Sequence, residues 1–148
     1  MKPFKLQTAL NVRQRFEKLK QKEFAEQLQV VQQIQTHMDE IKQSLSEREQ
    51  QLDVSKRQGF TIMELQIHSN YQQGVKQDLK RLSRQLKEQQ QLADSRQRVL
   101  IKATQKKRIL EILKEKQESR YKEEQKRIEQ AMMDEISQNQ YNLKNKER

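Results

Sequence analysis

Side chains able to perform acid–base chemistry are present in the 148-residue sequence, but their spacing does not suit catalysis. Asp134 and Glu135 are adjacent, as are Glu123 and Glu124, and both pairs lie in segments of helical character. Neighbouring residues on a helix point about 100° apart, so neither pair can act together on one substrate. We therefore predict no catalytic residue and expect a protein that is not an enzyme.

Patterns typical of a metal or cofactor site are also missing from the sequence. His37 and His68 are the only histidines and there is no cysteine; each histidine is predicted to be a core or seam residue rather than a ligand. The only glycines, Gly59 and Gly74, are too far apart for a Gly-rich phosphate-binding loop. No metal and no cofactor are expected.

The composition allows either a long helical or coiled-coil chain or a disordered one. Only 32% of the residues are hydrophobic and 35% are charged, which is too apolar-poor for a large globular core. Pro3 is the only proline, so no later residue blocks a helix. No apolar run approaches the roughly 18 residues of a membrane span. We expect a soluble, cytoplasmic protein without a transmembrane segment.

The net charge of +10 raises the question of a nucleic-acid partner. Up to Gln58 there are 11 basic and 8 acidic residues, and beyond it 20 and 13. Residues 95–110, "SRQRVLIKATQKKRIL", contain no acid and six basic residues: Arg96, Arg98, Lys102, Lys106, Lys107 and Arg108. This patch fits a solvated coiled-coil face and a partner-binding surface equally well.

Two apolar stripes have the 3,4 spacing of a coiled coil. The first stripe comprises Val31, Ile34, Met38, Ile41 and Leu45, and the second comprises Val75, Leu79, Leu82 and Leu86. We predict an all-α fold, a long antiparallel two-helix coiled-coil hairpin in which the second helix is longer and overhangs at its C-terminal end.

Residues in one layer of an antiparallel pair have numbers with a constant sum. A sum of 113 pairs Met38 with Val75, Ile34 with Leu79, and Val31 with Leu82, and places Leu45 beside His68 and Leu10 beside Ala103. The pair Leu28 and Leu86 sums to 114. The first stripe runs from Leu28 to Val31 and on to Ile34 in two successive steps of three residues, which predicts a local irregularity of the supercoil.

The turn is predicted where "DVSKRQGFT" breaks the heptads. Gly59 supplies a left-handed position after the first helix, and Thr61 with Glu64 forms a capping-box pattern for the second. One domain over residues 1–148 is expected, with helix one at about 4–52, a turn at about 53–60, helix two at about 61–141 and a tail at 142–148. Gly74 is predicted to be either a tolerated surface residue or the site of a kink or partner contact.

Beyond the first helix's reach, the second helix has no partner in the sequence. Its apolar stripe continues through Leu110, Leu113, Tyr121, Ile128, Met132 and Ile136. An unpaired stripe on a soluble chain is typical of a binding surface, although self-association and fraying are the alternatives.

Several separated segments resemble the FliJ family of flagellar type III export proteins. "FKLQTALNVRQRFE" is similar to the family's start, and "GFTIMELQIHSNYQQ" to its apex. "ATQKKRILEILKEKQESRYKEEQKRIEQAMMDEIS" is similar to its C-terminal signature, including Glu111 to Leu113 and the pair Asp134 and Glu135. The resemblance covers nearly the whole chain.

The resemblance implies a coiled coil similar to the central stalk of rotary ATPases. Family members insert into the flagellar export ATPase hexamer and promote its assembly and activity; they also contact the cytoplasmic domain of the export gate protein and escort export chaperones. By this analogy the chain would lie at the cytoplasmic face of the inner membrane at the flagellar base.

The same resemblance implies two sets of binding residues. The ATPase-binding set comprises Phe4, Leu6, Leu10, Arg13, Lys106, Lys107, Leu110 and Leu113. The export-gate set comprises Tyr71, Val75, Leu79 and Leu82. Relatives often have a bulky apolar residue after the Tyr-Gln-Gln, where this chain has Gly74, with Val75 one position later.

Two other classes of function stay open at this point. A nucleic-acid or anionic-membrane binder would need stacking aromatics or a continuous basic face, yet aromatics are 5% of the chain and acids interrupt the basic residues beyond Leu110. No nucleic-acid partner is therefore expected. A generic coiled-coil adaptor is the remaining alternative.

Overall fold

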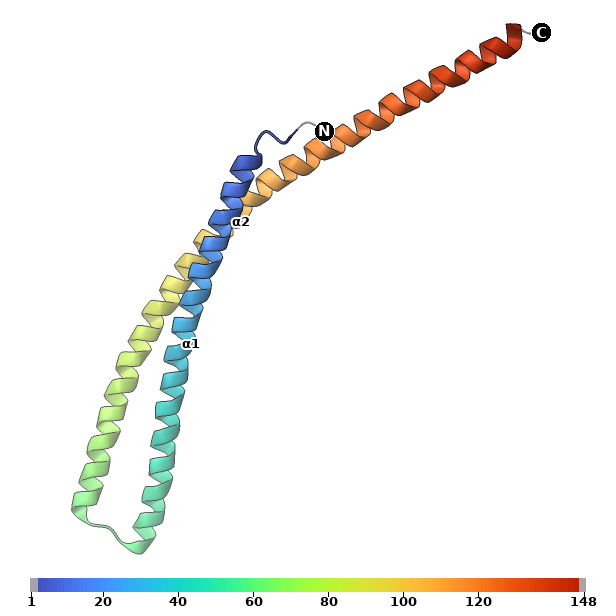
Figure 1. Ribbon diagram of the computed structural model, residues 1–148. Helices are drawn as coiled ribbons and strands as arrows, with labels where there is room; N and C mark the ends of the chain where they lie inside the picture. Colours follow the sequence, from blue (N-terminus) through green and yellow to red (C-terminus); the bar gives the residue numbers. More distant parts are fainter. Residues whose placement is uncertain (1–2, 147–148) are drawn as a thin grey trace. The chain divides into compact units, whose positions relative to one another are not determined.

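Two antiparallel helices that pack against each other form the fold (Figure 1). The computed structural model describes residues 3–146, in which α1 spans Gln7–Gln58 and α2 spans Ile62–Lys146 and no strand occurs. The predicted all-α class and the hairpin with a longer second helix are confirmed. Neither helix, over the described residues, contains a stretch apolar and long enough to cross a membrane.

The helix boundaries differ most from expectation at the turn. α1 continues to Gln58 rather than ending near residue 52, because "DVSKRQ" breaks the heptad pattern without containing a helix breaker. At the other ends, α1 begins at Gln7 rather than residue 4, and α2 continues past residue 141 to Lys146. Residues 147 and 148 of the predicted tail lie outside the described residues.

The loop between the helices is only Gly59 to Thr61, and its predicted chemistry is confirmed. Gly59 has φ +84°, a left-handed conformation that favours glycine. The Glu64 amide donates to Thr61 Oγ1 at 3.3 Å, and the Thr61 amide donates to Glu64 Oε2 at 3.3 Å. This reciprocal capping box starts α2 immediately after the turn.

The chain divides into two compact units, each with residues from both helices. The loop unit is Lys18–Lys102 and contains the α1–α2 loop. The terminal unit combines Met1–Glu17 with Ala103–Arg148. The single domain predicted over residues 1–148 stays a prediction, and its residues 1–2 and 147–148 lie outside the described part.

Cross-helix contacts in the loop unit show that the predicted pairing is one heptad out of register. Their residue numbers sum to between 116 and 121, not 113: Gln27 with Gln89, Glu23 with Arg96, Arg48 with Tyr71, and Glu49 with Gln72. A layer sum near 120 also matches the helix ends at Gln58 and Ile62. Met38 therefore lies opposite Leu82 rather than Val75.

The stripes themselves were predicted correctly, because a shift of seven residues returns the same helix faces to the seam. Val31, Val75 and Leu82 are buried, and the other residues of both stripes are half-buried. His68 is buried as predicted, but the register places it opposite Leu52. His37 was wrongly expected in the seam: it is exposed, with Nδ1 4.0 Å from Glu40 Oε2.

Gln27 takes the seam position that the sequence assigned to Leu28. Leu28 is 45% exposed, whereas Gln27 is 4% exposed. The Gln27 amide donates to Gln89 Oε1 at 2.6 Å and to the Gln89 carbonyl at 3.1 Å, which offsets the cost of its burial. With Gln27, the steps to Val31 and Ile34 become four and three, and the predicted irregularity is absent from this part of the seam.

The register can be tested by disulfide trapping, because the chain has no cysteine. Met38→Cys with Leu82→Cys should crosslink on mild oxidation, as measured by peptide mass spectrometry. Met38→Cys with Val75→Cys should not, because seven residues displace one partner by about 10 Å along the helix, beyond disulfide reach. Faster crosslinking of the second pair would contradict the register.

The two glycines should respond oppositely to alanine in urea unfolding followed by circular dichroism. Gly59→Ala should lower the free energy of unfolding by about 1 kcal/mol, because φ is positive there. Gly74 is exposed inside α2 and an added Cβ would meet no atom within 4 Å, so Gly74→Ala should raise it by about 0.5–1 kcal/mol. Loss of stability in Gly74→Ala would contradict the surface interpretation of this glycine.

Candidate functional site

All eight residues of the predicted ATPase-binding set lie in the terminal unit, but the structure gives them different environments. Leu10 is buried, with 3% exposure. The half-buried members are Phe4, Arg13, Lys107 and Leu110, and the exposed ones are Leu6, Lys106 and Leu113. Phe4 precedes α1, and its carbonyl accepts a hydrogen bond from the Gln7 amide at 3.0 Å.

The layer sum near 120 explains this partition. It places Leu10 opposite Leu110 and Arg13 opposite Lys107, whereas Ala103 lies opposite Glu17 and not Leu10. The division of the units follows the same register, since Glu17 and Ala103 both border the terminal unit. Leu10 and Leu110 therefore lie on the sides of the helices that face each other, and the exposed members Leu6, Lys106 and Leu113 are the ones accessible to a partner.

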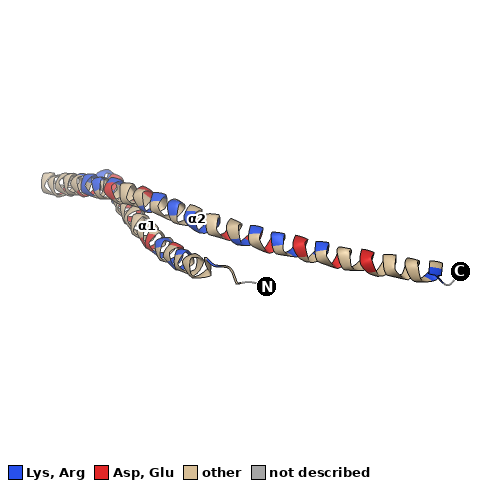
Figure 2. Ribbon diagram, turned by 90° about the horizontal axis from the view of Figure 1, so that it is seen from above, with Lys and Arg blue, Asp and Glu red and all other residues tan. Residues whose placement is uncertain are grey.

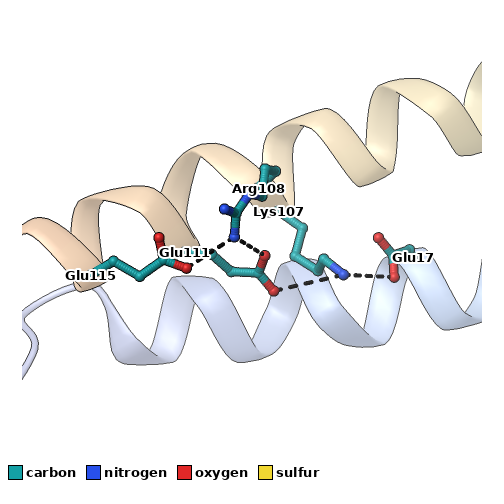
Figure 3. Close-up of polar contacts among 5 residues, drawn as sticks. All are labelled: Glu17, Lys107, Arg108, Glu111 and Glu115. Atoms are coloured by element: carbon teal, nitrogen blue, oxygen red, sulfur yellow. Dashed lines mark hydrogen bonds and ion pairs between the residues drawn. The ribbon is translucent and has the colours of Figure 1, made fainter.

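A chain of alternating charges crosses between the helices in the terminal unit (Figure 3). Glu17 comes from α1 and the other members come from α2. Lys107 Nζ lies 3.0 Å from Glu17 Oε1 and 3.7 Å from Glu111 Oε1. Arg108 Nη1 lies 3.3 Å from Glu111 Oε2 and 3.0 Å from Glu115 Oε1. Glu111 thus links the inter-helix pair to an exposed pair along α2.

The Glu17–Lys107 ion pair contributes to the packing of the two helices because Glu17 is buried. Glu17 is 7% exposed, and the small side chain of Ala103, which is 2% exposed, leaves room for it in the register. The hydrogen bond to Glu17 raises the pKa of Lys107 above its ordinary value of 10.5; burial acts against this rise, and the charges of Glu17 and Glu111 add to it. The ammonium group therefore stays charged at neutral pH and holds the helices together.

Sequence reasoning missed Glu17. The signal for it was a lone acidic residue among basic ones in "VRQRFEKLKQK", at a position on the buried face of α1. The structural role of Glu17 becomes apparent only when the register places Lys107 within ion-pair distance of it.

The overhang comprises residues 119–146 of α2, all of which are exposed. It begins later than the predicted start at Leu110, because the corrected register extends the α1 partner by about one heptad. Large apolar side chains remain uncovered along it: Tyr121, Ile128, Met132, Met133, Ile136, Tyr141 and Leu143. Basic and acidic residues are interspersed along the same helix (Figure 2).

The predicted export-gate set lies in the loop unit and is partly covered by α1. Val75 and Leu82 are 7% and 8% exposed, and Leu79 is half-buried. Tyr71 is half-buried beneath Arg48, whose Cζ lies 3.9 Å from the ring centroid. A partner that leaves the helices paired therefore meets the rim of this surface around Tyr71.

The next residue extends that rim. Gln72 Nε2 donates to Glu49 Oε1 at 3.1 Å, so α1 contributes Arg48 and Glu49 to the surface around Tyr71. Both α1 residues escaped sequence reasoning, because a layer sum of 113 places them elsewhere.

The basic segment at 95–110 divides between structural and exposed residues. Arg96 donates to the Glu23 carbonyl at 3.1 Å within the loop unit. Lys107 belongs to the inter-helix pair of the terminal unit. Arg98, Lys102 and Lys106 are exposed. The segment is therefore neither a purely solvated face nor a continuous basic surface.

Metal ligation receives no support from residues 3–146, where no group of three or more His, Asp or Glu side chains is placed to hold an ion. The charged cluster around Lys107 consists of paired opposite charges, which stabilise helix contacts.

Lys107→Met should lower the free energy of unfolding by about 1–3 kcal/mol, because it removes the ammonium partner of a buried carboxylate. Lys106→Met, at an exposed neighbouring position, should change it by less than about 0.5 kcal/mol. Thermal melting followed by circular dichroism measures both.

The pH dependence follows from the raised pKa of Lys107. A raised folded-state pKa gives stability that is complete below the unfolded value and is lost as the pH rises through the folded value. The difference in melting temperature between wild type and Lys107→Met should therefore hold from neutral pH to about pH 9 and shrink above 10.5. A difference unchanged in strong alkali would show that the amine charge is not its cause.

Comparison with known proteins gives one family assignment. Residues 1–146 match the family described as Flagellar FliJ protein. No curated protein and no solved structure gives a significant match. The match spans nearly the whole chain, including both helices and the loop. The chain therefore belongs to the FliJ family and is a component of the flagellar protein export apparatus.

Proposed function

We propose that this protein acts as a non-enzymatic central stalk of the flagellar export ATPase, binding inside the hexamer through its terminal unit and promoting assembly and activity. The observation that carries the proposal is the overhang, in which 28 consecutive residues, 119–146, are helical and exposed while bearing an apolar stripe. Such a helix gains most by lying against a surrounding apolar or mixed sleeve.

The stripe has the geometry of a binding face. Tyr121, Ile128, Met132 and Ile136 recur at steps of seven and four, and their side chains are 38–59% exposed. Steps of this size keep them on one side of the helix. The opposite side carries polar residues such as Gln130 and Ser137, so a partner can distinguish the two sides.

Two further partners are part of the proposal, and family membership together with the exposed rim around Tyr71 supports them. The cytoplasmic domain of the export gate protein would contact the rim around Tyr71, with Arg48 and Glu49 from α1, whereas Val75 and Leu82 are buried between the paired helices. Export chaperones would be escorted to the same machinery. The protein would then reside in the cytoplasm, peripherally at the inner membrane at the flagellar base. A generic coiled-coil adaptor has the same fold but would not affect the ATPase.

The test measures ATP hydrolysis by the cognate export ATPase as increasing amounts of this protein are added, at near-physiological salt. Stimulation should saturate near one chain per six ATPase subunits, as a central stalk requires. Ile128→Asp with Met132→Asp should raise the protein concentration needed for half-maximal stimulation by about 100-fold, because two apolar contacts are lost. Deletion of residues 119–148 should abolish stimulation.

Gln130→Asp with Ser137→Asp is the matched control, since it adds the same charge on the opposite side of the same helix. It should stimulate like wild type. All these positions are exposed, so circular dichroism should show unchanged helicity for the point variants. Full stimulation by the truncated chain would contradict the proposal and leave the adaptor interpretation.

A further inference from the structure

The loop end of the hairpin displays the most exposed large apolar side chains in the described part of the chain. Ile62 is 86% exposed and Met63 is 72% exposed. Val54, Leu65 and Ile67, on either side of the loop, are 45–57% exposed. We call these five residues the apolar tip. All of them belong to the loop unit.

Neither packing nor helix initiation explains Ile62 and Met63. Their side chains contribute almost nothing to the seam, given their exposure. They occupy the first two positions of α2, where polar and acidic residues favour helix formation. The α2 start is instead secured by the Thr61–Glu64 capping box. The fold therefore holds these apolar side chains in place without using them.

The apolar tip differs in pattern from a helix-binding stripe. Ile62 and Met63 are consecutive, so their side chains point about 100° apart, and Leu65 and Ile67 add further directions. Val54 adds a side chain from α1. A groove on a protein contacts one side of a helix, whereas this arrangement suits a medium that surrounds the end of the hairpin.

Two exposed cations, Lys56 and Arg57, lie in the last turn of α1 beside the apolar tip. Residues 54–67, the span of the tip, contain one acid, Glu64, whose carboxylate accepts a hydrogen bond from the Thr61 amide. Asp53 directly precedes this span, and its contact with Lys56 is long, at 3.9 Å. Exposed apolar side chains beside exposed cations are a combination that binds the interface of anionic membranes.

We propose that the apolar tip inserts into the interfacial region of an anionic lipid bilayer, with Ile62 and Met63 entering the headgroup–acyl boundary and Lys56 and Arg57 contacting lipid phosphates. This contact involves only the end of the hairpin and leaves the overhang free. It is independent of the ATPase binding proposed above, which would use the terminal unit.

Vesicle binding of the full-length protein tests the proposal. Because the chain has no cysteine, one introduced cysteine can be labelled selectively with an environment-sensitive fluorophore. Gln58→Cys places the label beside the tip, and Gln130→Cys places it in the overhang as the control. Vesicles of phosphatidylcholine with 30% phosphatidylglycerol should shift the Gln58→Cys emission to the blue, and lipids with bromine in the upper acyl chain should quench it. The Gln130→Cys emission should stay unchanged, and pure phosphatidylcholine should give little signal.

Two double variants separate the apolar and basic contributions. Ile62→Ser with Met63→Ser should lower the partition coefficient at least about tenfold, from the apolar area no longer buried. Lys56→Gln with Arg57→Gln should lower it by on the order of tenfold on anionic vesicles only. Met132→Ser with Met133→Ser, at overhang positions that are 59% and 67% exposed, should have no effect.

Three results would overturn the proposal. Undiminished partitioning of the Ile62→Ser, Met63→Ser variant would show that the chain's net positive charge alone attracts the vesicles. Quenching at Gln130→Cys rather than Gln58→Cys would assign binding to the overhang. Dimerisation in sedimentation velocity without lipid, abolished by the same tip variant, would assign the tip to a second copy of the chain.

Discussion

A loop of three residues, Gly59 to Thr61, determines how α1 lies against α2. Because α1 ends at Gln58 and α2 begins at Ile62, every layer must pair residues whose numbers sum to about 120. The left-handed Gly59 closes α1 and the capping box opens α2, so no residue is left over to lengthen the turn. The membership of the seam, the Glu17–Lys107 pair and the start of the overhang all depend on this register.

Apolar packing alone would not select it. A shift of one heptad returns the same stripes to the seam and pairs Val31 with Leu82 as plausibly as Met38 with Leu82. The polar layers distinguish the two. At a sum of 120 Gln27 faces Ala93 and reaches Gln89, whereas at 113 it would face Leu86 and risk an unsatisfied amide. Buried polar contacts thus add register specificity that leucine and valine cannot provide.

The sequence therefore predicted the helices, the stripes and the turn residues, all of which depend on local chemistry at Gly59, Thr61 and Glu64. It failed where a heptad break was taken for a helix break after Leu52. That error moved Leu110 from the seam into the predicted overhang and hid Glu17. Pairing partners are non-local, and periodicity determines them only up to multiples of seven residues.

The two surfaces that the fold leaves apolar differ in how their side chains are arranged, and this difference separates their partners. The overhang mixes six basic with five acidic residues over 119–146, and its apolar stripe runs along one side of the helix, so it suits a protein sleeve of mixed polarity. At the loop, residues 54–67 contain two basic residues and one acidic residue, and the exposed apolar side chains of the tip point in several directions, so they suit a medium that surrounds the end of the hairpin. Each surface uses exposed apolar side chains for affinity, and the arrangement of these side chains decides which kind of surface is bound.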